Sequence, residues 1–276
     1  MFDNLSETGR AAVFYAIAFG LAAIAALFAP TLGEGALMLM MLTPTAAALV
    51  MVLLVTREGR SRGAWAGLGL TRAGWSGWPL AILAPTVLLS VAYVILWATD
   101  FGDYQPTNDG RPVPAIVVSS FVGLLIGIVM ALGEEIGWRG FMLPRLLPLG
   151  VVPAMLIVGF CHGVWHMPAI LLTPYYHADG NLLIVVPLFL ITLTLAGIFF
   201  GYLRIVTGSV WPVAIAHAVH NDVWAFFAER TTGPSPEMIE YLGGESGVIE
   251  IAGLAVLAAI LLRLLRGRRF PAAAPA

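Results

Sequence analysis

Side chains able to do acid–base or metal chemistry interrupt three apolar stretches of this sequence. A carboxylate and an imidazole that meet can activate a water molecule, hold a metal ion, or form part of a proton relay. Burying an unpaired charge in hydrocarbon costs several kcal/mol, so ionisable residues inside apolar runs are candidates for function. In chain order the interrupting residues are Glu134, Glu135, Arg139, His162, His166, His217, His220, Asn221 and Asp222.

Helical spacing predicts which of these side chains share a face. Residues four apart stack on one side of a helix, so Glu135 can pair with Arg139. Glu134 is rotated by about 100° from Glu135 and is free to face a cavity between helices. His162 and His166 share a face by the same rule.

The third stretch predicts a second polar face. His217 and Asn221 lie four residues apart and share a side of their helix, with His220 turned partly aside. A cavity lined by Glu134, His166, His217 and Asn221 would give each of these side chains a partner. Glu135 and Arg139 are predicted to support it as an ion pair. The simpler interpretation of His162, His220 and Asp222 is structural, with His162 as a hydrogen-bonding residue between helices.

The elements that must position these residues are membrane helices. The chain has 276 residues, of which 59% are hydrophobic and only 11% charged, whereas globular domains carry roughly 25% charged residues. The composition predicts an all-α polytopic membrane protein. The net charge of -2 gives no indication of nucleic-acid binding, and the single cysteine, Cys161, excludes an internal disulfide.

A spanning helix needs about 20 mostly apolar residues. Eight runs meet this need, at residues 11–30, 36–56, 79–98, 114–132, 151–172, 182–203, 209–228 and 248–266. We therefore expect about eight transmembrane helices enclosing an intramembrane polar cavity. The fifth run must tilt or break if His166 is to reach the depth of Glu134. A cleaved signal peptide is the competing interpretation of the first run, and its length and hardly basic leading segment favour retention.

The arginines predict the orientation. With eight spans both termini lie on one side, and twelve of the fourteen basic residues fall on that side, all but Arg111 and Arg230. The positive-inside rule then places both termini in the cytoplasm. We expect a single membrane domain over residues 1–276, with a motif-bearing core at about 114–228 and a disordered tail at 267–276.

The three polar stretches resemble the motifs of a known family. Glu134, Glu135 and Arg139 are similar to an EExxxR motif, His166 within Trp165-His166-Met167-Pro168 to the second motif, and His217 with Asn221 to an HxxxN motif. Together they resemble the CPBP family (CAAX protease and bacteriocin-processing, also named Abi), which is related to the type II CAAX prenyl endopeptidases. The second motif is often written FxxxH, and His162 stands here in the place of that Phe. The resemblance covers residues from about 118 to 226.

The resemblance implies an intramembrane endopeptidase that hydrolyses a peptide bond of a membrane-associated peptide or protein. We expect it in the bacterial cytoplasmic membrane. The resemblance also implies that Glu134 is the general base, that His166 holds or polarises the water, and that His217 and Asn221 donate hydrogen bonds to the oxyanion. These four residues are the predicted catalytic set. The expected partners are the peptide or membrane-protein substrate and the lipid bilayer. No nucleic-acid partner is expected.

Two alternatives stay open at this point. No cofactor is assigned, but zinc is possible, with Glu134, His166 and His217 as three ligands and a water in the fourth position; no HExxH sequence is present. The other alternative is a non-enzymatic membrane protein, either a transporter or a bacteriocin-immunity or scaffold protein. Carboxylates and histidines inside spans also form proton relays. The distinguishing feature is whether the four residues meet in one cavity.

Overall fold

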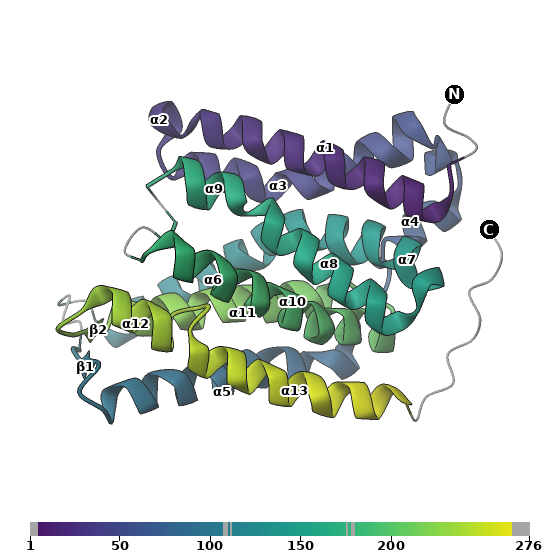
Figure 1. The fold of residues 1–276 in the computed structure, drawn as a ribbon. Helices are drawn as coiled ribbons and strands as arrows, with labels where there is room; N and C mark the ends of the chain where they lie inside the picture. The colour runs from purple at the N-terminus through teal and green to yellow at the C-terminus, as the bar shows by residue number, and fades with distance from the viewer. Residues whose placement is uncertain (1–4, 107–109, 111, 175, 178–179, 267–276) are drawn as a thin grey trace.

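The computed structural model describes residues 5–106, 110, 112–174, 176–177 and 180–266. Over these residues the chain is a bundle of helices with one small two-stranded ribbon, which confirms the all-α class (Figure 1). The tail predicted to be disordered, residues 267–276, lies outside the described residues.

The first half of the chain supplies the outer helices of the bundle. Its elements are α1 (Glu7–Leu27), α2 (Ala29–Leu32), α3 (Gly35–Val50) with a π-turn at Met51–Val55, a 3-10 turn at Glu58–Arg60, α4 (Arg62–Gly67), a 3-10 turn at Trp75–Gly77, α5 (Trp78–Trp97) and β1 (Asp103–Tyr104). Helix α1 begins where the Ser6 side chain accepts a hydrogen bond from the Gly9 amide, which satisfies one of the free amides of its first turn.

The second half carries all the polar motifs. Its elements are α6 (Val113–Glu135), a π-helix at Ile136–Met142, α7 (Leu143–Leu146), a 3-10 turn at Leu147–Leu149, α8 (Val151–Trp165), α9 (Met167–Leu172), α10 (Leu182–Thr207), α11 (Trp211–Ala228), β2 (Thr231–Thr232), α12 (Pro236–Gly243) and α13 (Val248–Arg266). The two strands pair antiparallel, Asp103 with Thr232 and Tyr104 with Thr231.

Seven of the helical segments are long and apolar enough to cross a membrane, and they confirm a polytopic membrane protein. They correspond to seven of the eight predicted runs. The remaining run, residues 209–228, is α11, a helix of 18 residues whose histidines, Asn221 and Asp222 lower its hydropathy. Because α11 packs against α5 and α6, the bundle shelters these polar residues. The start of α1 and the end of α13 lie at the same end of the bundle (Figure 1).

Neighbouring helices form a continuous packed bundle. Helix α10 packs between α8 and α13, and α3 packs between α1 and α6. In Figure 1, α1 and α3 form one side of the bundle, while α5 and α13 form the other. The contact between α8 and α10 is close, because a Cβ on Gly159 would lie 2.5 Å from the Leu193 carbonyl oxygen. Small residues permit such close approach in membrane helices.

Two interruptions of regular helix geometry fall at the motifs. The sequence Ile136–Met142 winds as a π-helix directly after Glu134 and Glu135, and such segments are frequent at functional sites. Helix α8 ends at Trp165 and α9 begins at Met167, so of the two expectations for this run, a tilt or a break, the structure shows a break, and His166 lies at it. Pro168 lies in the first turn of α9, where a missing amide costs nothing.

Candidate active site

The centre of the site is a hydrogen bond between α6 and α8. His162 Nε2 lies 2.7 Å from Glu134 Oε2, and both side chains are buried. On the other side of the ring, Arg139 Nη1 lies 3.2 Å from His162 Nδ1. A guanidinium only donates, so Nδ1 must accept and the ring proton must sit on Nε2. His162 therefore donates to Glu134 as a neutral imidazole.

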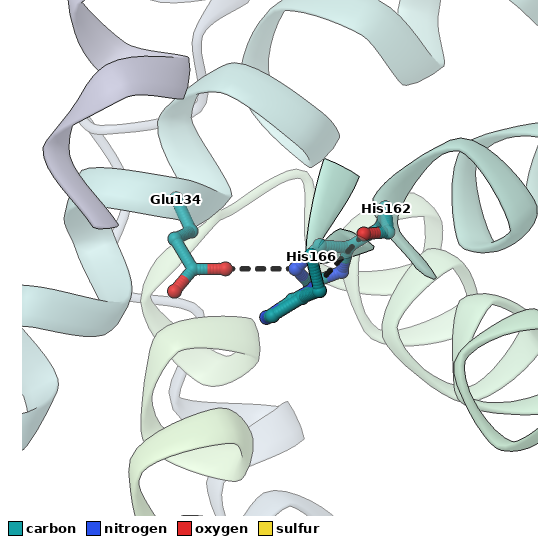
Figure 2. Close-up of side chains that lie close together, drawn as sticks. All are labelled: Glu134, His162 and His166. Atoms are coloured by element: carbon teal, nitrogen blue, oxygen red, sulfur yellow. Dashed lines mark hydrogen bonds and ion pairs between the residues drawn. The ribbon is translucent and has the colours of Figure 1, made fainter. Parts of the chain in front are cut away.

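His166 is held by the backbone of the same helix. Its Nδ1 donates to the His162 carbonyl oxygen at 2.9 Å, which leaves Nε2 with a lone pair when the ring is neutral. No hydrogen bond to His166 Nε2 or to Glu134 Oε1 is formed by the residues that the structure describes. In Figure 2 these two free ends point to the same side of the Glu134–His162 bond.

Glu135 is the hub of a second set of contacts. Arg139 Nη1 donates to both of its carboxylate oxygens, at 2.9 and 3.0 Å. His217 Nδ1 lies 3.0 Å from Glu135 Oε1, so this nitrogen carries a proton. The Arg139 guanidinium also lies 4.8 Å from the centre of the Phe200 ring, an arrangement that favours a cation. The ion pair predicted between Glu135 and Arg139 is formed, and both side chains are fully buried.

The protonation of His217 follows from these contacts. Its Nε2 can donate to an oxyanion only if the ring is an imidazolium, because Nδ1 already carries a proton. Glu134 and Glu135 bring two negative charges to the buried site, and Arg139 brings one positive charge. A positive charge on His217 would make the sum of these four charges zero. Buried charges persist when they are paired.

The polar residues line one cavity of about 220 Å³. All four members of the predicted catalytic set contribute to its wall: Glu134, His166, His217 and Asn221. Apolar side chains form much of the remaining lining, among them Met40 from α3, Leu88 from α5 and Phe199 from α10. The hydrolase interpretation requires a shared cavity of this kind, and a site walled by apolar groups strengthens each electrostatic contact inside it.

Sequence reasoning undervalued several residues of this cavity. His162 does form the predicted hydrogen bond between helices, but its partner is Glu134 itself. His220, assigned a structural role, contacts Asn221 and Glu250. Glu250 was not singled out, although a lone carboxylate inside the last apolar run is the signal that should have found it. Asp222 forms no part of the cavity wall as the structure describes it.

A histidine outside the spans links the cavity wall to α12. His177 lies in the segment between α9 and α10 and is almost fully buried. Its Nδ1 lies 2.6 Å from Glu240 Oε1, and its Nε2 lies 2.9 Å from Glu245 Oε1, at ion-pair distance but without hydrogen-bond alignment. Burial alone would lower the pKa of His177, but the carboxylates of Glu240 and Glu245 outweigh burial and raise the pKa to about 9.

This pair of contacts predicts a loss of stability in alkali. Because the pKa of His177 is raised from its ordinary 6.5 to about 9, its contribution is complete below pH 6.5 and is lost as the pH rises through about 9. The shift corresponds to about 3 kcal/mol. We expect the melting temperature in detergent to fall more between pH 7 and pH 10 for the native protein than for His177→Gln. An equal fall in both proteins would show that the contacts do not stabilise the fold.

The fold and site define an integral membrane protein with a buried carboxylate–imidazole centre. Residues 116–223 match the family described as type II CAAX prenyl endopeptidase Rce1-like. No curated protein matches the chain. The family match runs from α6 through α11 and includes every residue of the predicted catalytic set. It supports an intramembrane protease of the CPBP family and confirms the resemblance drawn from the motifs. A protease of this CAAX type acts on a peptide or protein substrate in the membrane.

Proposed function

We propose that this protein hydrolyses a peptide bond of a membrane-associated peptide with a water molecule activated by Glu134 and His166. The observation that carries the proposal is the pair of free acceptors, Glu134 Oε1 and His166 Nε2, in a cavity that also contains His217 and Asn221. A water between the two acceptors would donate one hydrogen bond to each. Its oxygen lone pair would then face the open part of the cavity.

The proposed reaction has two steps. The water oxygen attacks the carbonyl carbon of the peptide while one water proton passes to Glu134, which gives a tetrahedral oxyanion. Nε2–H of the His217 imidazolium and the amide of Asn221 donate hydrogen bonds to that oxyanion. When the C–N bond breaks, the proton on Glu134 passes to the leaving nitrogen. The products are a carboxylic acid, which keeps the second water proton until it passes to the amine or to solvent, and an amine; Glu134 returns to its starting state.

The surrounding contacts fix the reacting groups. His162 donates to one oxygen of Glu134, so only the other oxygen is free to take the proton. Arg139 fixes the His162 tautomer and, through Glu135, the orientation of His217. Preorganised groups of this kind need not reorganise when charge develops. We therefore assign Glu135, Arg139 and His162 to positioning.

The protonation of the candidate ligands argues against zinc binding at this site. Glu134, His162 and His166 offer ligand atoms within 4.8 Å of one another. To bind a metal, however, His162 Nε2 would have to lose its proton while Nδ1 still accepts from Arg139, which would leave an imidazolate. In the other possible set His217 replaces His162, but His217 is not part of the close group found among the described residues. We therefore propose a glutamate-type, metal-independent hydrolysis.

Chelation tests this choice. We expect the purified protein in lipid to keep its turnover after treatment with a strong chelator, because no step needs a metal ion. Metal analysis of the same active sample should find far less than one zinc per chain. Loss of activity in chelator, with recovery on stoichiometric zinc and not on magnesium, would overturn the metal-independent proposal.

The substrate class is proposed at the level of chemistry. The cavity lies within the helix bundle, so the scissile bond must reach it from a peptide that is itself at or in the membrane. We propose leader sequences or other membrane-associated peptides as substrates. We further propose that the protein resides in a bacterial cytoplasmic membrane with both termini in the cytoplasm, on the basis of its arginine distribution.

Comparative membrane peptidomics tests the proposed function and identifies the substrate together. Membranes from cells producing the native protein would be compared with membranes from cells producing Glu134→Gln at equal abundance. We expect defined cleavage products in the first sample only. The matched control is Glu229→Gln, an exposed carboxylate at the end of α11, which should give the native pattern. Identical peptide sets from native protein and Glu134→Gln would contradict the proposal.

A further inference from the structure

The last helix sends a carboxylate into the catalytic cavity. Glu250 lies in the first turn of α13, its side chain is completely buried, and it lines the cavity. Its Oε1 lies 2.8 Å from His220 Nε2. A carboxylate accepts, so His220 Nε2 carries a proton. Helix α13 lies beyond residues 116–223, so this contact is outside the segment that matches the family.

His220 connects this carboxylate to Asn221. The second ring nitrogen, Nδ1, lies 3.3 Å from Asn221 Oδ1. Because an amide oxygen also accepts, Nδ1 must carry a proton as well. His220 therefore donates from both nitrogens, as an imidazolium. The charge on Glu250 stabilises this form in a partly buried place, where an unpaired cation would be costly.

From this geometry we infer that Glu250 and His220 are positioning residues that fix the amide of Asn221. The inference rests on the proposed function, in which Asn221 donates to the oxyanion. His220 holds Oδ1 of Asn221, and Asn221 lines the cavity; we infer that the NH2 group, which this contact leaves free, faces the cavity. The amide is thereby set with its donor group, and not its carbonyl, toward the reacting bond.

Removing the charge of Glu250 should reverse this orientation. Gln at position 250 can still accept from His220 Nε2, but it cannot stabilise the imidazolium. The neutral ring keeps its proton on Nε2, so Nδ1 presents a lone pair to Asn221. The Asn221 amide would then rotate to donate its NH2 to Nδ1 and turn Oδ1 into the cavity. An amide oxygen beside a developing oxyanion opposes the reaction.

The test is a comparison of Glu250→Gln, Asn221→Ala and the double variant. Loss of one oxyanion donor costs about 10²- to 10³-fold in kcat, so we expect each single variant to lose kcat to this extent with KM changed by less than about threefold. The double variant should be no slower than Asn221→Ala, because residues that act through one another are not additive. The exposed carboxylate of Glu237 in α12 gives the control, since Glu237→Gln should match the native kcat.

A second variant separates the loss of positioning from a failure to fold. Replacing both His220 and Glu250 by Leu removes the pair without leaving a charge unpaired, and such exchanges are often tolerated. It should show the same loss of kcat as Glu250→Gln. Native kcat in either variant, or losses that add to that of Asn221→Ala, would overturn the inference. If either of these results is found while Glu134→Gln is inactive, only the positioning role of Glu250 and His220 is wrong. If Glu134→Gln is active, the proposed hydrolysis itself is wrong.

Discussion

Replacing Glu134 by Gln is expected to lower the turnover of the protein by about 10²- to 10⁴-fold, the range for loss of a general base. Gln has nearly the same volume and can still accept the hydrogen bond from His162. What it cannot do is take a proton from water. The folded state should therefore survive, and KM should change little. The measurement is kcat in proteoliposomes with the substrate found by peptidomics.

The control for this loss is structural. Glu134→Gln should elute as the native protein does in size-exclusion chromatography, and its melting temperature should stay within a few degrees. If the variant kept native turnover, Glu134 would not be the base, and the role assigned to His166 would fall with it. An inactive variant that also fails to fold would require Glu134→Asp as the next comparison, which should keep a measurable fraction of activity.

Replacing Arg139 by Met should prevent accumulation of folded protein. Arg139 is fully buried and supplies the positive charge that pairs with the buried carboxylate of Glu135. Breaking a buried ion pair by removing one partner costs about 3–5 kcal/mol, because the remaining charge is left uncompensated. This is a large part of the roughly 5–15 kcal/mol of stability of a typical native protein. The yield of monodisperse protein in detergent measures the effect.

A matched double variant separates charge from packing. In Arg139→Met with Glu135→Gln, the unpaired carboxylate is gone, and the Gln carbonyl can still accept from His217. We expect this protein to recover folding but not native activity, because the His162 tautomer and the charge on His217 are no longer fixed. A single Arg139→Met variant that folds as well as native protein would show that the ion pair does not support the site.

The sequence was most informative where one physical rule dominated. Apolar runs of about 20 residues predict spans because backbone groups cannot be left unpaired in lipid. The (i, i+4) rule predicted the Glu135–Arg139 pair, and the depth of His166 predicted that its helix tilts or breaks; the break falls at His166 itself. These features depend on local geometry along one segment, so residue spacing alone could predict them.

Contacts between different segments could not be predicted from residue spacing. The hydrogen bond from His162 to Glu134 depends on how α8 is oriented relative to α6. The bond from His220 to Glu250 depends on where α13 packs in the bundle. The small residues Gly159 and Gly197 set the distance between α8 and α10, but their spacing says nothing about rotation. The π-helix at Ile136–Met142 also changes the faces of its residues in a way that a regular period of 3.6 does not predict.

The account depends most directly on one water molecule between Glu134 and His166. The measurement is an experimental structure of the native protein in a lipid nanodisc, at a resolution that shows ordered water. We predict a water within about 2.7–3.1 Å of both Glu134 Oε1 and His166 Nε2, with His162 still bonded to the other carboxylate oxygen. A metal ion at that position, or a Glu134 carboxylate turned away from both histidines, would contradict the proposed hydrolysis.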